Sequence, residues 1–208
     1  MAKIKNIIFD FDGVILDSVP VKTEAFRQLF KDFPSNIVDQ FITYHEENGG
    51  ISRYIKIEYF FKTLLKENIT ETEVIKYANK YSLLTKQELA NPKYLIGESF
   101  DFIKEHYRNI NMHVASGADE ADLHYICDTL ELNQFFISIH GSPTPKNDVV
   151  KNILLIHKYI LKETILIGDS INDFTAADKN NITFYGYNNT SLEEDHHYIK
   201  SFNTIDFI

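Results

Sequence analysis

The distribution of apolar residues divides the chain into three stretches. The first, KNIIFD at residues 5–10, is a continuous apolar run of the kind that forms a strand buried on both faces of a parallel sheet. The second, residues 18–91, contains only segments with apolar residues at helical spacing. The third, residues 92–208, alternates helical segments with strand-like runs. Alternation of this kind predicts an α/β fold with right-handed crossovers.

The middle stretch predicts a bundle of helices. Its helical segments are broken at Pro34 and at Gly49-Gly50. Thr70 and Glu73 have the spacing of a capping box, which marks the start of the last helix. The aromatic residues of YIKIEYFF (54–61) recur at helical spacing, and we expect them to form the core of the bundle.

The last stretch predicts four further strands, each after a helix. They are NMHVAS, FFISIHG, TILIGD and ITFYGY. We therefore expect a Rossmann-like parallel sheet with helices on both faces, formed by residues 1–17 and 92–208. The α-helical bundle of residues 18–91 would then be an inserted cap.

Composition excludes several classes of partner. The chain has 208 residues and a formal net charge of −9, which argues against a nucleic acid or an anionic membrane as partner. No apolar run approaches the roughly 20 residues of a membrane span. Asp10 interrupts the first apolar run, so we expect no secretory signal and a cytoplasmic location. The sequence makes no prediction of oligomeric state.

Carboxylates stand at the ends of two predicted strands. Asp10 and Asp12 follow the first strand, whereas Asp169 ends TILIGD and Asp173 comes one helical turn later. Ligands of open parallel sheets bind beyond the carboxyl ends of the strands, so we expect these four acids to converge. Ionised carboxylates in one small volume need a cation, and hard oxygen ligands suit Mg²⁺.

A second group of residues at this edge could hold an anion. Ser116 and Gly117 end the strand NMHVAS, and Lys146 follows the strand FFISIHG. A hydroxyl, a backbone N–H and an ammonium are all donors to an anion. A divalent metal, a bound anion and a free carboxylate together suggest phosphoryl transfer.

Four motifs in one order resemble those of a known family. DFDGVILDS (10–18), VASG (114–117), Lys146 and IGDSINDFTAA (167–177) resemble the four motifs of the haloacid dehalogenase superfamily of phosphohydrolases. The helical stretch after the first motif is similar to the inserted cap of its branch of phosphoglycolate phosphatases and β-phosphoglucomutase-like enzymes. The order and spacing match over the whole chain.

The resemblance implies a role for each acid. Asp10 would be the nucleophile that attacks phosphorus and forms an aspartyl-phosphate. Asp12 would be the general acid toward the leaving group and then the base for the hydrolytic water. Asp10, the backbone carbonyl of Asp12 and Asp169 would hold Mg²⁺, with Asp173 in support directly or through water.

The resemblance also implies a phosphate site. Ser116 and the amide of Gly117 would bind phosphate oxygens, and Lys146 would neutralise charge on the phosphate and the nucleophile. The family usually follows this lysine with proline, whereas here Pro145 precedes it. Lys151, one helical turn later, is therefore a rival for this role.

The cap is expected to select the substrate. GGISRY (49–54) resembles a cap loop of the β-phosphoglucomutase-like branch, so Arg53 is a candidate substrate ligand, the alternative being an exposed surface arginine. His45 is expected on a solvated helix position, the alternative being a position that faces the cleft. We expect His196-His197 to lie in a solvated terminal segment without metal-ligand geometry.

The leading hypothesis is a Mg²⁺-dependent phosphatase acting on a small phosphorylated metabolite such as a sugar phosphate, a polyol phosphate or a phosphoglycolate-like acid. A sugar phosphomutase of the same fold is an alternative, although its branch typically has a histidine where this chain has Lys22. A phospho-acceptor regulatory module is a third possibility, but it would need neither Asp12 nor the helical insert.

Overall fold

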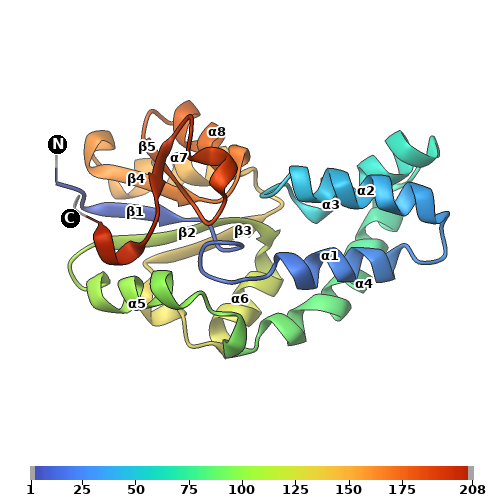
Figure 1. Ribbon diagram of the computed structural model, residues 1–208, viewed down its shortest axis with the longest axis horizontal. Helices are drawn as coiled ribbons and strands as arrows, with labels where there is room; N and C mark the ends of the chain where they lie inside the picture. Colours follow the sequence, from blue (N-terminus) through green and yellow to red (C-terminus); the bar gives the residue numbers. More distant parts are fainter. Residues whose placement is uncertain (1–2, 206–208) are drawn as a thin grey trace.

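A parallel sheet forms the centre of the computed structural model, which describes residues 3–205 (Figure 1). The strand order is β3-β2-β1-β4-β5-β6, and every neighbouring pair runs parallel. The predicted α/β fold class is therefore confirmed. The strands are β1 (Asn6–Phe9), β2 (Asn111–Asp119), β3 (Ser138–Ser142), β4 (Thr164–Gly168), β5 (Thr183–Tyr187) and β6 (His197–Ile199).

The sixth strand was not predicted, although His197 at its start is exposed, as expected of a solvated terminal segment. His197 begins β6 and pairs in parallel with Tyr185 of β5. The strand is only three residues long and lies at the edge of the sheet, and Ile199 is its one buried residue. An element this short has no alternating pattern that sequence reasoning could detect.

Helices cover both faces of the sheet. In Figure 1, α5 (Gly97–His106) and α6 (Glu120–Thr129) lie below it, and α7 (Lys146–His157) and α8 (Ile171–Lys179) lie above it. Neighbouring side chains of β1 pack into two separate cores, Ile7 into the core with α5 and α6 and Ile8 into the core with α7 and α8. A strand buried on both faces has this continuous apolar sequence because successive side chains point to opposite sides.

Residues 19–89 contain the helical insert at one end of the sheet (Figure 1). Pro34 precedes the second helix and Thr70 makes a capping box with Glu73, as predicted. Within residues 3–205 every helix is too short or too polar to cross a bilayer. The helices of the insert are α1 (Val19–Leu29), α2 (Ser35–Glu47), α3 (Arg53–Tyr59), the π-helix η1 (Phe60–Leu65) and α4 (Glu71–Leu89). Short 3₁₀ turns elsewhere are η2 (Pro92–Tyr94), η3 (Asn133–Phe135), η4 (Leu161–Glu163), η5 (Thr190–Leu192) and η6 (Phe202–Thr204).

Aromatic rings fill the core of this insert. Phe30 and Phe60 are fully buried and stack with their ring centroids 3.7 Å apart. Phe41 meets both rings edge-on, at 5.1 and 5.4 Å. The predicted burial of the YIKIEYFF aromatics is confirmed for Phe60 and Phe61, whereas Tyr54 and Tyr59 are only partly buried against this core. Phe, Tyr and Trp bury the largest areas per side chain, so a few rings suffice to hold a small bundle together.

A histidine is buried between the sheet and the loop after α7. His113 of β2 places Nδ1 2.7 Å from the Ser138 hydroxyl and Nε2 2.9 Å from the Tyr159 hydroxyl. Its ring lies 4.8 Å from that of His157. Burial, reinforced by the charges that His157 and His140 can carry, lowers the pKa of His113 to about 3.

His113 should make the stability of the protein depend on pH. Unfolding returns the imidazole to an ordinary pKa of about 6.5, so below that pH the unfolded chain binds more protons than the folded one. The free energy of unfolding should therefore fall as the pH decreases, by about 2 kcal/mol from this residue at pH 5. Urea unfolding at pH 7.5 and pH 5 measures this change. The free energy of unfolding of His113→Gln should differ less between the two pH values than that of the original protein. The exposed His124→Gln variant is the control, and an unchanged difference in His113→Gln would contradict the assignment.

Candidate active site

The carboxyl ends of β1 and β4 bring three of the predicted acids together. Each of Asp10, Asp169 and Asp173 offers a carboxylate oxygen, and these three oxygens lie within 4.8 Å of one another. Asp10 follows β1 directly and its N–H donates to the Ile167 carbonyl at 2.8 Å. Asp173 lies in the first turn of α8. The end of the strand and the start of the helix thus fix the acids independently of any ligand.

Lys146 is the lysine of this cluster. It is the first residue of α7, and its ammonium lies 2.9 Å from Asp10 Oδ1 and contacts Asp173 Oδ1. The ammonium is buried with both acids. The rival Lys151 is exposed on the same helix. Geometry therefore favours Lys146 for the role of the motif lysine.

Three acids share one cation, Lys146, and the pKa values of two of these acids are raised as a result. Burial raises the pKa of Asp10 well above its usual value, and Asp173 adds to this, although Lys146 opposes it. Burial and Asp173 likewise raise the pKa of Asp169 to about 7. Burial lowers the pKa of Lys146, but Asp10 and Asp173 outweigh it and the pKa is raised. One ammonium is thus too little charge for the two buried carboxylates and the half-buried carboxylate of Asp169.

The residues fit a hard divalent cation such as Mg²⁺. The negative charge of the three carboxylates exceeds the positive charge of Lys146, and carboxylate oxygens are the ligands that this ion prefers. Asp173 is already engaged, because Oδ1 contacts Lys146 and Oδ2 accepts the Ser170 N–H at 3.1 Å and its hydroxyl at 2.6 Å. Asp10 and Asp169 are therefore better placed as direct ligands, and Asp173 as the residue that positions Lys146.

Glycine is required where the first motif turns over Asp169. Gly13 has φ of +73°, and a Cβ at this position would lie 2.0 Å from Asp169 Oδ2. Any other residue would clash with the carboxylate and adopt a strained backbone. The turn thus allows the backbone after Asp12 to lie against the acid cluster.

The side chain of Asp12 faces away from the other acids and binds the start of the cap. Its Oδ1 accepts the Ser18 hydroxyl at 2.5 Å and lies 2.5 Å from Lys22 Nζ. Burial raises the pKa of Asp12, but Lys22 and Ser18 outweigh it, so the pKa is lowered. Sequence reasoning assigned neither partner to Asp12. Only their spacing could have indicated these partners, because Ser18 ends the first motif and Lys22 follows one helical turn later.

The predicted phosphate ligands of β2 lie beside Asp12 and under the cap. The Ser116 hydroxyl accepts the Ala118 N–H at 3.0 Å and lies 3.5 Å from Asp12 Oδ2. A Cβ on Gly117 would lie 2.1 Å from the Gly50 carbonyl oxygen. The cap loop therefore rests directly on the backbone of Gly117.

Arg53 connects the cap to the core. Its guanidinium donates to Asp122 Oδ2 of α6 at 2.7 Å and to the Ser82 hydroxyl at 2.6 Å. Only 6% of Arg53 is exposed, so the alternative of an exposed surface arginine is wrong. The reason is that α3 and α6 both pack against α4, which brings the arginine within reach of a core acid. Its role toward a substrate stays a prediction.

Further contacts hold the cap closed. The Tyr54 hydroxyl donates to Asp119 Oδ2 at 2.6 Å. The Asn172 side-chain amide donates to the Gly49 carbonyl at 2.5 Å. Side chains of α3 and α8, together with the loop at Gly49-Gly50, thus join the cap to the core around the acids.

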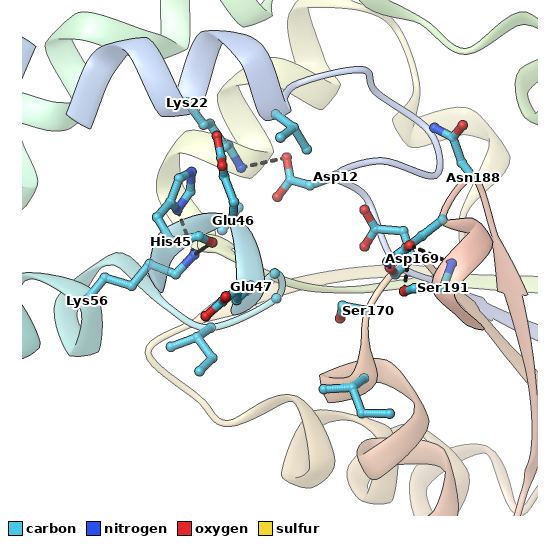
Figure 2. A pocket seen from close by; sticks show the side chains of 18 of the residues that line it. Asp12, Lys22, His45, Glu46, Glu47, Lys56, Asp169, Ser170, Asn188 and Ser191 are labelled. Atoms are coloured by element: carbon cyan, nitrogen blue, oxygen red, sulfur yellow. Dashed lines mark hydrogen bonds and ion pairs between the residues drawn. The ribbon is translucent and has the colours of Figure 1, made fainter. Parts of the chain in front are cut away.

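A pocket of about 440 Å³ lies between the cap and the acids. Figure 2 shows Lys22, His45 and Lys56 on its cap side, facing Asp12 and Asp169. His45 is only 8% exposed, which corrects the expectation of a solvated position. The helix pattern alone did not show that α2 turns this residue toward a neighbouring helix and a cavity.

Comparison with known proteins identifies the family. The model of the haloacid dehalogenase-like hydrolase family matches residues 7–187. The chain therefore belongs to this family of enzymes, and the resemblance seen in its motifs is confirmed. A comparison with curated protein sequences finds no match.

Solved structures share this fold over nearly their full length. β-Phosphoglucomutase from Clostridium difficile has a TM-score of 0.76 at 17% identity, covering 98% of this chain and 94% of that one. A variant of CbbY from Rhodobacter sphaeroides in complex with xylulose-(1,5)bisphosphate has a TM-score of 0.75 at 16% identity, covering 97% and 96%. The HAD-hydrolase YfnB from Bacillus subtilis, bound to magnesium, has a TM-score of 0.70 at 20% identity, covering 96% and 95%. At these identities the likeness shows the fold.

Breaking the Arg53–Asp122 pair should destabilise the protein strongly. Asp122→Asn leaves a buried guanidinium without its carboxylate, which should lower the free energy of unfolding by about 3 kcal/mol. Asp39→Asn is the matched control, because it breaks the exposed pair with Arg27 and should cost less than about 1 kcal/mol. Urea unfolding measures both. Equal losses in the two variants would show that the Arg53–Asp122 pair is not buried in solution.

Proposed function

We propose that this protein is a Mg²⁺-dependent phosphatase that hydrolyses a small phosphomonoester through an aspartyl-phosphate on Asp10. The observation that supports this most directly is the arrangement of the Asp10 carboxylate. Among residues 3–205, its contacts with Lys146 and with the Phe11 N–H both fall on Oδ1. One carboxylate oxygen is thus held by donors, while Oδ2 has no protein partner and is available for attack.

The metal would lie beside this carboxylate. Its ligands would be Asp10, the backbone carbonyl of Asp12 and Asp169. Asp173 would hold Lys146 in position through their contact. When bound, Mg²⁺ would supply the positive charge that keeps the acids ionised and neutralises phosphate oxygens. Lys146, the Ser116 hydroxyl and the Gly117 amide would bind the remaining phosphate oxygens.

The first chemical step transfers the phosphoryl group to the enzyme. The Asp10 oxygen attacks phosphorus, a new O–P bond forms, and the P–O bond to the leaving alcohol breaks. Asp12 donates a proton to the departing oxygen, so the alcohol leaves neutral. Because Lys22 and Ser18 favour the ionised form of Asp12, this carboxylate must take up a proton when substrate binds.

The second step returns the enzyme to its starting state. Asp12, now ionised, accepts a proton from water as the water oxygen attacks phosphorus. The bond between phosphorus and Asp10 breaks, and inorganic phosphate leaves. Lys22 and Ser18 hold Asp12 in the form that this step requires. Residues 18–91, as the cap, would close over the site during both steps and exclude bulk water.

Lys22 favours hydrolysis over the alternative phosphomutase reaction. A mutase must keep water from its phosphorylated aspartate until the second sugar hydroxyl arrives. In this chain a lysine is paired with Asp12, at the position where that branch typically has histidine. The pair favours an ionised base beside the phosphoaspartate, which suits attack by water.

Replacing the nucleophile should abolish activity without unfolding the protein. Asp10→Asn should lower Mg²⁺-dependent phosphate release from p-nitrophenyl phosphate and a panel of small phosphomonoesters by at least about a thousandfold. Asp17→Asn is the control, since this acid of the same motif is exposed. A chelator should silence the original protein. Activity that survives either change would contradict the mechanism.

Binding of the metal can be followed without substrate. Mg²⁺ should raise the melting temperature of the protein, because an ion that binds only the folded state stabilises it. Asp169→Asn should weaken this effect, since it removes one proposed ligand. Differential scanning calorimetry at increasing Mg²⁺ concentration measures both. An identical response of the variant would exclude Asp169 as a ligand.

A further inference from the structure

Lys56 is a buried lysine without an acidic partner. It lies on α3 and is only 4% exposed. Among the described residues its ammonium forms hydrogen bonds only with His45, at 2.8 Å from Nδ1 and 3.1 Å from the backbone oxygen. Across residues 3–205, no carboxylate lies within 4.0 Å of it. The other two cations of the pocket are paired, Lys22 with Asp12 and Arg53 with Asp122.

This arrangement is unfavourable for the protein by itself. An ammonium removed from water needs a counter-charge or a full set of acceptors. Here burial lowers the pKa of Lys56 to about 7, and the nearby charge of Lys22 adds to this. Asp12 and Asp169 act in the opposite direction but do not restore the usual pKa. Buried charges that cost stability are typical of functional sites, where a ligand supplies the missing partner.

The histidine beside Lys56 also has an unused donor. A charged lysine can only donate, so Nδ1 of His45 accepts its proton and the ring hydrogen lies on Nε2. This Nε2 is buried and has no hydrogen-bond partner among the described residues. Burial and Lys56 lower the pKa of His45 to about 3, so the ring stays neutral. When Lys56 is protonated, the pair thus carries one positive charge and one unpaired N–H.

Both residues line the same pocket as Asp12 and Asp169. They stand on the cap side, with Asp12 and Asp169 on the core side (Figure 2). Glu46 and Glu47 also line the pocket, but both are exposed to solvent. A substrate whose phosphate lies at the core acids would therefore extend its other end toward the cap and Lys56.

We propose that Lys56 and His45 recognise a carboxylate at the end of the substrate remote from its phosphate. The inference rests on the proposed phosphatase function and narrows its substrate class to phosphorylated hydroxy acids. A carboxylate carries one negative charge, which one ammonium neutralises, and its oxygens can accept the remaining N–H groups. A second phosphate would bring nearly two charges to a site with one unpaired cation.

Arg53 is the competing candidate for this role, and its contacts count against it. Its charge is already matched by Asp122, and its guanidinium also bonds to Ser82. Releasing it to a substrate would leave Asp122 buried without its partner. Lys56 has no such pair to break. The structure therefore assigns selection of the distal group to Lys56.

Matched substrates test this assignment. We would measure kcat/KM for phosphoglycolate against ethyl phosphate, and for 3-phosphoglycerate against glycerol 3-phosphate, because each pair differs in the carboxylate. The original protein should prefer the acid of at least one pair by about ten- to a hundredfold, the effect of one hydrogen bond to a charged group. Lys56→Met should remove the preference, mainly through KM, and leave kcat/KM for the two substrates without a carboxylate within about twofold.

Controls separate recognition from folding. Lys76→Met removes an exposed lysine of the cap and should keep the preference. Lys56→Met should melt at the same temperature as the original protein or higher, because it removes a buried unpaired charge. If Lys56→Met fails to fold, Lys56→Gln serves in its place. His45→Gln should lower the preference partly.

Several results would overturn the inference. They are equal kcat/KM within both substrate pairs, a stronger preference for a bisphosphate such as xylulose 1,5-bisphosphate, or an equal loss in Lys56→Met on substrates with and without the carboxylate. Calorimetric binding of 3-phosphoglycerate and glycerol 3-phosphate to Asp10→Asn gives a readout without turnover. Carboxylate-dependent binding that Lys56→Met removes would support the inference even if no phosphate is released. In that event only the proposed hydrolysis would fail.

Discussion

The contact of Lys146 with two buried acids is the interaction on which the rest of the site depends. Its ammonium joins Asp10 of the first motif to Asp173 of the last, which are far apart in sequence. Without it, the buried carboxylates of Asp10 and Asp173 would lie together with no internal cation, at a cost of several kcal/mol. The parallel sheet makes the meeting possible because it ends β1 and β4 at the same edge. The same few residues therefore stabilise this edge of the sheet and form the candidate active site.

Sequence alone predicted most of the sheet because its strands are strongly apolar. β1 and β4 are buried on both faces, so continuous runs such as TILIG could be recognised. The acids could also be placed, since a residue that ends a parallel strand must lie at the ligand-binding edge. The edge strand β6 had no comparable signal. Its three residues depend on pairing with β5 rather than on a pattern of their own.

What could not be predicted was how the cap meets the core. Lys22, His45 and Lys56 all lie on helices, where sequence pattern fixes a face but not the element that the face will contact. Arg53 was recognised as a candidate ligand, but its partner Asp122 lies 69 positions later and carries no motif. Contacts between separate packing units depend on their mutual orientation. No local rule of spacing contains that information.

The close contact of Gly50 with Gly117 constrains how this enzyme could evolve. Two backbone segments touch where a single methyl group would collide with a carbonyl oxygen. A side chain at position 117 would therefore displace the loop at Gly50 from the core and expose the acids to solvent. Adaptation to a bulkier substrate therefore cannot proceed by substitution at the contact between Gly50 and Gly117. It must instead proceed through the walls that α2 and α3 provide, where side chains can be exchanged while the lid still closes.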